Sequence, residues 1–156
     1  MKIKLFFRLL LCSAALILFA ACTTGDEDEV PVIDPVSTTF MGDLVIYLND
    51  WTTYTDKDVK ISVNYDTENG TATMIFYQVK FAERMPVRLD MTVSGVSYTV
   101  TTSNITIAGN NIVPYAMGGP FVDYTITNLS GTVTGEDMTF TMKCGPYPVL
   151  FKGKAF

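Results

Sequence analysis

The stretch "VKISVNYDTENGTATMIFYQVKF", residues 59–81, contains two alternating runs joined by a turn. Four apolar residues of its first half alternate with polar ones: Val59, Ile61, Val63 and Tyr65. A period of two is typical of a β-strand with one buried face, because successive side chains of a strand point to opposite sides. "TENG", residues 67–70, predicts a hairpin turn, because Asn-Gly tolerates positive φ. The stretch therefore predicts an antiparallel β-hairpin.

Similar alternation continues toward the C-terminus. "VDYTIT", residues 122–127, sets Val122, Tyr124 and Ile126 against Asp123 and two threonines. "MTFTMKC" sets one apolar face against a polar one, and that apolar face consists of Met138, Phe140, Met142 and Cys144. No segment carries a helical stripe. The runs predict eight to ten strands, near residues 40–48, 58–66, 71–82, 87–94, 96–102, 104–108, 121–128, 130–135, 136–144 and 148–155. Short, evenly spaced antiparallel strands are typical of an all-β barrel or sandwich.

The N-terminus has the layout of an export signal. Basic residues within positions 2–8 precede an apolar run over 9–19, and small residues follow. The run is shorter than the roughly 20 apolar residues that a membrane-spanning helix needs. "FAAC", Phe19 to Cys22, resembles a bacterial lipobox. This resemblance implies that residues 1–21 are a lipoprotein signal peptide and that Cys22 is acylated, which anchors the chain to a membrane. A plain secretion signal with an incidental cysteine is the alternative.

Residues 22–37 carry charge and proline but little that could pack. "DEDE", residues 26–29, followed by "VPVIDPVS" predicts a disordered acidic tether. An acidic run just after the lipidated cysteine also resembles the surface-export signal of Bacteroides-type lipoproteins. The resemblance implies a protein on the outer face of the bacterial outer membrane. A solvated linker without a sorting role is the alternative.

Composition excludes several functions. The formal net charge of −5 does not suit a phosphate-backbone binder, which needs clustered Lys and Arg, so we expect no nucleic-acid partner. The absence of histidine removes the Ser-His-acid triad, the Cys-His pair and the HExxH zinc site. Cysteine spacing offers no metal site, and we expect no cofactor. Asp123 with Glu136 or Asp137 leaves a carboxylate-only glycosidase as an alternative. We expect a protein that is not an enzyme.

Two stretches, at opposite ends of the barrel region, resemble a known family. "TTFMGDLVIYL", residues 38–48, has an aromatic-x-Gly-x-Leu opening. "ITNLSGTVTGEDMTFTMKC" with "VLFKGKAF" has a Gly turn before the penultimate strand and a Gly near the C-terminus. Both resemble calycin-like β-barrel lipoproteins of Bacteroides-type bacteria. The resemblance covers most of residues 38–156 and implies one antiparallel, lipocalin-like barrel domain of about eight strands.

Aromatic residues in or beside predicted loops are the candidate binding residues: Trp51, Tyr54, Tyr115 and Tyr147. Such rings could cover a barrel mouth or stack on a sugar. We expect a non-catalytic surface lipoprotein whose barrel binds a small apolar or amphipathic ligand. The alternatives are a structural or protein-interaction module of a cell-surface complex, which a filled barrel would favour, and a carbohydrate-binding β-sandwich.

Overall fold

The structure is a computed structural model and describes residues 35–48 and 52–156. Its strands are antiparallel, and one 3-10 helix, η1 (Val122–Tyr124), interrupts them. The strands are β1 (Thr38–Tyr47), β2 (Thr53–Asp66), β3 (Thr71–Val79), β4 (Leu89–Val100), β5 (Ile105–Gly109), β6 (Tyr115–Ala116), β7 (Gly119–Pro120), β8 (Ile126–Thr134), β9 (Asp137–Cys144) and β10 (Tyr147–Ala155). The predicted signal peptide and most of the predicted tether lie outside the described residues.

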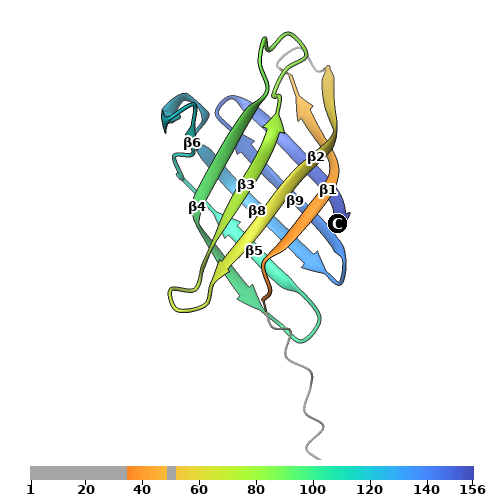
Figure 1. Ribbon diagram of the computed structural model, residues 1–156, viewed down its shortest axis with the longest axis vertical. Helices are drawn as coiled ribbons and strands as arrows, with labels where there is room; N and C mark the ends of the chain where they lie inside the picture. The colour runs from red at the N-terminus through yellow and green to blue at the C-terminus, as the bar shows by residue number, and fades with distance from the viewer. Residues whose placement is uncertain (1–34, 49–51) are drawn as a thin grey trace, which may run out of the picture.

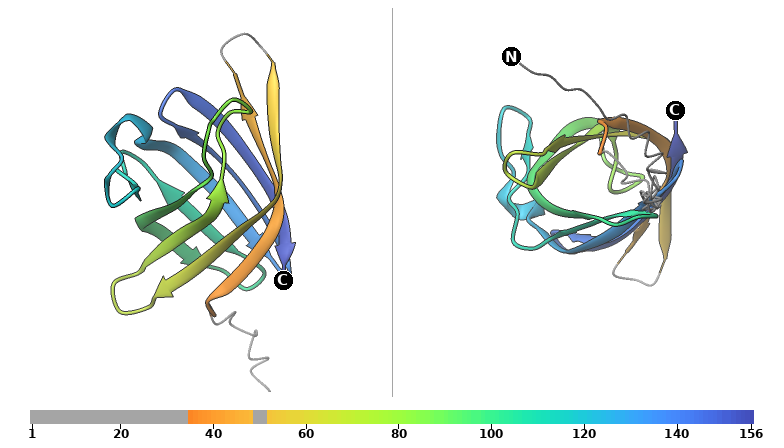
Figure 2. Two further views of the ribbon diagram at one scale, coloured as in Figure 1. Left: turned by 45° about the horizontal axis from the view of Figure 1, so that its top comes forward. Right: turned by 90° about the horizontal axis from the view of Figure 1, so that it is seen from below.

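Eight of these strands close into a barrel (Figures 1 and 2). Each strand of the series β1, β2, β3, β4, β5, β8, β9 and β10 pairs with the next, and β10 pairs with β1. The short strands β6 and β7 form a hairpin that pairs with β4. The predicted all-β antiparallel barrel is therefore confirmed, and the sandwich alternative is wrong.

The barrel has two different ends. We call the end with the connections 80–88, 110–125 and 145–146 the loop end, and the end with the turns 67–70, 101–104 and 135–136 the hairpin end. β1 begins at the hairpin end, so the chain enters the barrel there (Figure 1).

Aromatic side chains fill the interior. Phe76 on β3 and Phe140 on β9 come from opposite walls, four strands apart around the ring. Their ring centroids lie 6.0 Å apart, and the Phe140 and Phe151 rings stack at 5.2 Å. All three side chains are at most 1% exposed. Because rings from opposite walls meet, the barrel is closed to a ligand at this level.

β-bulges explain where the predicted strand boundaries were wrong. Gly95, at φ +78°, lies within β4, and the inward face moves from Met91 and Val93 to Val96. The predicted strands 87–94 and 96–102 are therefore one strand. A bulge adds one residue to one strand of a pair and shifts the alternation, which imitates a break in the sequence pattern. A bulge at Asn128 likewise led to two predicted strands, 121–128 and 130–135, where the structure has the single strand β8.

The predicted strand at 121–128 begins too early. Val122 and Tyr124 lie in η1 and share no strand face with Ile126, and Val122 is 64% exposed. The backbone N–H and the Oγ1 hydroxyl of Thr125 both donate to the Val122 carbonyl oxygen, at 3.1 and 2.6 Å. These hydrogen bonds favour a tight turn over an extended chain.

Glycines close the seam between the first and last strands. Gly42 on β1 lies directly opposite Gly153 on β10. A methyl group on Gly42 would overlap the Lys152 carbonyl oxygen and the Gly153 Cα. The Phe151 ring occupies the space beside Gly153. The glycines of "MGD" and "KGK" are therefore needed for close approach of the two strands.

Candidate functional site

The predicted binding residues that the structure describes all lie at the loop end, but they do not form one site. Tyr54 on β2 and Tyr147 on β10 are partly buried and pack against the core, whereas Tyr115 on β6 is 54% exposed. Tyr147 contacts other rings, and Tyr54 lies near the carboxylate of Asp56. Trp51 and the predicted lipidation site Cys22 lie outside the described residues.

A cluster of rings packs together at the loop end. The Tyr124 ring stacks on Phe121 at 4.4 Å and also contacts Phe81 at 5.8 Å and Tyr147 at 6.4 Å. Phe81 is 1% exposed, although it lies in the β3–β4 connection. Burial raises the pKa of Tyr124. Of these four rings, Tyr147 alone was a predicted binding residue, because strand periodicity does not report contacts between loops.

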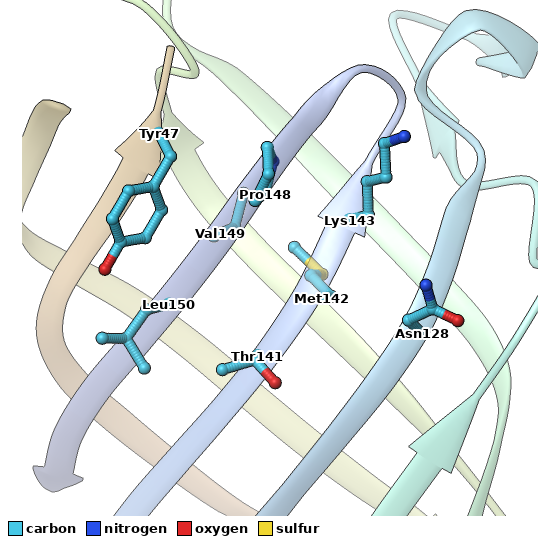
Figure 3. A pocket seen from close by; sticks show the side chains of 8 residues that line it. All are labelled: Tyr47, Asn128, Thr141, Met142, Lys143, Pro148, Val149 and Leu150. Atoms are coloured by element: carbon cyan, nitrogen blue, oxygen red, sulfur yellow. The ribbon is translucent and has the colours of Figure 1, made fainter. Parts of the chain in front are cut away.

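A groove lies on the outer face of the barrel, near the loop end (Figure 3). Its volume is about 350 Å³. It crosses four neighbouring strands, β1, β10, β9 and β8. The outward side chains that line it are Tyr47, Pro148, Leu150, Thr141, Lys143 and Asn128. We call this feature the outer groove.

The outer groove has an apolar wall and a polar wall. β1 and β10 contribute Tyr47, Pro148 and Leu150 on one side, and β9 and β8 contribute the polar residues on the other (Figure 3). The strand register pairs Leu150 with Thr141, and Pro148 with Lys143. Directly opposed residues of antiparallel strands have Cβ atoms about 5 Å apart, so the two walls are close neighbours.

A β-bulge brings Asn128 to this surface. β8 pairs Thr127 with Lys143 and Ser130 with Thr141, so Asn128 and Leu129 both lie opposite Met142. Asn128 has φ +52° and is exposed, whereas Leu129 is 3% exposed. The Asn128 backbone N–H donates to Oδ1 of Asn110 at 3.2 Å, which holds the bulge. Uninterrupted alternation from Ile126 would have directed Asn128 inward.

A second hollow, of about 310 Å³, lies toward the hairpin end. Asp137, Thr139, Lys152 and Lys154 line it. Nζ of Lys154 is 2.9 Å from Oδ1 of Asp137, and both side chains are mostly exposed. The hollow is therefore polar, and Asp137 pairs with one of the two lysines that line it.

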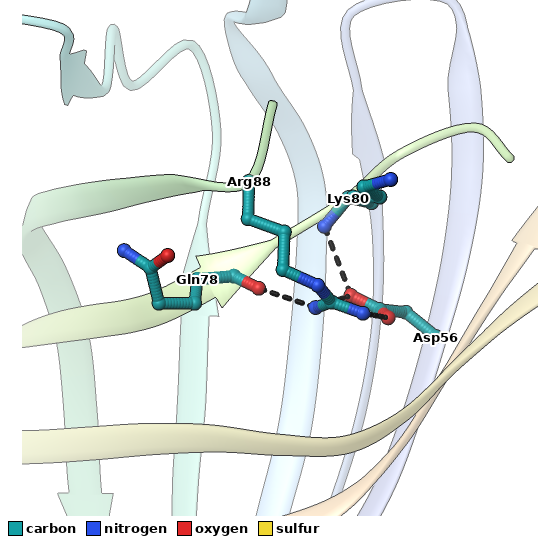
Figure 4. A network of polar contacts seen from close by, with 4 residues as sticks. All are labelled: Asp56, Gln78, Lys80 and Arg88. Atoms are coloured by element: carbon teal, nitrogen blue, oxygen red, sulfur yellow. Dashed lines mark hydrogen bonds and ion pairs between the residues drawn. The ribbon is translucent and has the colours of Figure 1, made fainter. Parts of the chain in front are cut away.

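An ion pair between Arg88 and the buried carboxylate of Asp56 holds the β3–β4 connection (Figure 4). The Asp56 carboxylate, 1% exposed, accepts hydrogen bonds from Nη2 and Nη1 of Arg88 at 2.7 and 3.1 Å and from the Lys80 backbone N–H at 2.9 Å. Nη1 of Arg88 also donates to the Gln78 carbonyl oxygen at 2.5 Å. The hydrogen bond with Asp56 raises the pKa of Arg88. Three N–H groups thus engage the carboxylate, which clamps both ends of the 80–88 connection.

Tyr54 lies beside this ion pair. Burial raises the pKa of Tyr54, and the Asp56 charge raises it further. Asp56 faces inward because a bulge at Asp58, with φ +54°, shifts the alternation of β2. Neither Asp56 nor Arg88 stands out in the sequence, since Asp56 precedes the predicted strand 58–66 and an acid in that position gives no sign of burial.

Cys144 faces the barrel interior, as predicted. It is fully buried, and its thiol donates to the Tyr124 carbonyl oxygen at 3.7 Å. Burial raises the pKa of Cys144 to about 12, so the thiol is protonated at neutral pH. The thiolate is the nucleophilic form of cysteine.

The proposed carboxylate pair does not exist. Asp123 lies in η1 at the loop end, whereas Glu136 and Asp137 lie at the hairpin end, and the length of β9 separates them. This glycosidase alternative is therefore wrong. Among residues 35–48 and 52–156, no group of three His, Cys, Asp or Glu side chains could hold a metal ion.

Comparison with protein families, curated proteins and solved structures finds no match to this chain. Within the described part of the chain, no helix has the length and apolar character needed to cross a membrane.

Proposed function

We propose that the protein is a lipid-anchored, cell-surface lipoprotein of the calycin-like barrel type that binds a small apolar or amphipathic ligand in the outer groove. The observation that carries this proposal is the groove itself, with an apolar wall beside a polar one. Its volume of about 350 Å³ falls in the range of about 300–1,000 Å³ that is usual for small-molecule sites. We place the ligand in the outer groove because rings from opposite walls close the interior at the level of Phe76 and Phe140.

The position of the anchor is compatible with this site. β1 begins at the hairpin end, whereas the outer groove lies toward the loop end. An acyl chain on Cys22, joined through the acidic tether, attaches the barrel by its hairpin end. The groove then lies on the half of the barrel farther from the point of attachment and stays open to solutes.

The anchor is tested in cells. Cys22→Ala removes the thiol that receives the acyl chains, so we expect release from the membrane fraction and loss of labelling by a fatty-acid analogue. Replacement of Asp26 to Glu29 by alanine is the matched control, since it leaves Cys22 in place and should protect the barrel from protease added to whole cells. Unchanged acyl labelling of Cys22→Ala would exclude the lipoprotein.

The site is tested by titration of purified protein with octyl glucoside below its critical micelle concentration. We expect saturable binding that Leu150→Ser weakens, because this change removes apolar surface from the groove. Ile75→Ser is the control, since Ile75 is also a partly exposed apolar residue but lies on β3, in the opposite wall. Equal loss in both variants would show that the amphiphile binds the barrel nonspecifically.

A protein-interaction module is the second candidate function, and the loop end favours it. The connections 80–88 and 110–125 expose five large apolar side chains: Val87, Val113, Tyr115, Met117 and Val122. Met117 is 74% exposed and has φ +52° at the tip of the β6–β7 hairpin. Clustered exposed apolar side chains often mark interaction sites.

A further inference from the structure

We infer that the ligand of the outer groove is an amphiphile with an acidic head, which Lys143 binds, and an apolar tail that lies on Leu150 and Tyr47. This inference rests on the proposed function and specifies its ligand class. Lys143 is the one charged side chain among the residues that line the groove, and no carboxylate lines it. No other described residue forms an ion pair with Lys143. The charge of the groove is therefore positive and uncompensated by the described residues.

Two neutral polar side chains extend the site for the head. The Thr141 hydroxyl and the Asn128 amide lie on the same wall as Lys143 (Figure 3). Neither side chain hydrogen-bonds to another described residue, so each has a free donor. Carboxylate, sulfate and phosphate oxygens accept hydrogen bonds from all three groups, and such bonds to an ionised acceptor are stronger than neutral ones.

The apolar wall places the tail. Tyr47 is 43% exposed on β1, and Leu150 is partly exposed on β10. β9, which carries Lys143, and β1 are two strand steps apart, which corresponds to roughly 10 Å at the usual strand spacing. A short alkyl or aryl tail that starts beside Lys143 therefore crosses β10 and reaches the Tyr47 ring. The hollow at the hairpin end lacks an apolar wall, because polar side chains and Gly153 line it.

The test compares three amphiphiles with one tail and different heads. Octyl sulfate, octyl glucoside and octyltrimethylammonium are titrated calorimetrically, below their critical micelle concentrations, into a chain that begins at Thr23. This chain keeps every described strand and every described core side chain. We expect octyl sulfate to bind about tenfold or more tightly than the other two, the difference that a charge-assisted hydrogen bond supplies. Lys143→Gln should remove this preference.

Lys152→Gln is the matched control, because Lys152 is also an exposed lysine of the outer face but lies beside the other hollow. It should leave the preference for octyl sulfate unchanged. A second arm measures binding to vesicles of phosphatidylcholine with and without phosphatidylglycerol. If the protein binds only the vesicles that contain phosphatidylglycerol, and this binding depends on Lys143, the acidic head belongs to a membrane lipid. Lys143-dependent binding of octyl sulfate monomers would assign it to a free amphiphile.

The outcomes separate this inference from the proposed function. Equal binding of all three amphiphiles, weakened by Leu150→Ser but not by Lys143→Gln, would overturn the acidic head and keep the groove as a binding site. Absence of binding by any amphiphile and by vesicles would overturn the proposed function and the inference together.

Discussion

At the scale of the residue, the tip of the β6–β7 hairpin carries an unfavourable side chain. Ala116 pairs with Gly119, so Met117 and Gly118 form a two-residue turn with φ +52° and +84°. Turns with positive φ at both positions favour Asn-Gly, because a Cβ is poorly tolerated there and Asn tolerates it best. A methionine that is 74% exposed gains little packing in return.

Met117→Asn should therefore stabilise the protein. We expect the free energy of unfolding to rise by about 0.5–1 kcal/mol, as backbone relief at a compatible site usually gives. Urea denaturation measures the change, and Gly118→Ala is a control that should destabilise. A loss of stability in Met117→Asn would show that the methionine makes contacts in the fold. If the loop end binds a partner, the same stabilised variant should bind it less well.

Because the thiol of Cys144 is buried, we expect the stability of the protein to depend on pH in the alkaline range. Its pKa rises from an ordinary value of 9.0 to about 12 because of burial. The unfolded chain ionises first, so the stability that depends on the neutral thiol is complete below pH 9 and is lost as the pH rises toward 12. The free energy of unfolding should fall by about 1 kcal/mol between pH 9 and pH 10 through this group.

Cys144→Ala should lack this part of the fall, and denaturation of both proteins at several pH values measures it. The measured interval ends at pH 10, because burial also raises the pKa of Tyr65 from 10.0 to about 12. Above pH 10, the ionisation of Tyr65 in the unfolded chain would add to the loss of stability. In a chain that begins at Thr23, which retains Cys144 and lacks Cys12 and Cys22, iodoacetamide should modify the native thiol far more slowly than the unfolded one. Equal pH slopes in the two proteins, or fast alkylation of the native protein, would contradict the buried position.

At the scale of the element, the connection 80–88 is held by one carboxylate. Asp56 binds the backbone at Lys80 and the side chain of Arg88, and between them Phe81 packs into the ring cluster. Loss of Arg88 leaves a buried carboxylate with a single remaining N–H donor. Such a carboxylate is costly, because the interior solvates it poorly.

Arg88→Gln should destabilise the protein by about 2–3 kcal/mol, less than for a fully buried pair because Arg88 is 42% exposed to screening water. Chemical denaturation measures the loss. Lys154→Gln breaks the exposed pair with Asp137 and should leave the free energy of unfolding nearly unchanged, because water and salt screen such a pair. Similar effects of the two changes would show that the clamp is no stronger than a surface ion pair.

At the scale of the whole molecule, the barrel depends on the approach of its first and last strands. Gly42 and Gly153 meet at the β1–β10 seam, where no side chain fits on Gly42. The ring of strands cannot close if these backbones are forced apart, because each would then be an unpaired edge.

Gly42→Ala should destabilise the protein by about 3 kcal/mol or more, since the methyl group meets backbone atoms that cannot rotate away. Gly119→Ala is the control, because nothing lies within 4 Å of its Cβ position. Thermal unfolding of the two variants measures the difference. Equal stability would show that the seam can widen without loss of closure.

The sequence by itself determined the strand character of the chain. Alternation along residues 59–65 and 138–144 predicted the inward faces of β2 and β9 correctly, Cys144 included. It succeeded because the period of two is a local property of an extended chain with one buried side. The Asn69-Gly70 turn was also correctly placed, since turn geometry depends on neighbouring residues.

Only the tertiary structure decided the closure, the bulges and the candidate site. Gly42 meets Gly153, and Phe76 meets Phe140, across long separations that no local pattern encodes. The bulge at Asn128 reverses the inward and outward positions of a strand, and the partner strand determines it. The outer groove combines side chains from four strands, and rings from opposite walls meet inside the barrel. Pairing between distant strands therefore decides which side chains come together at the candidate site.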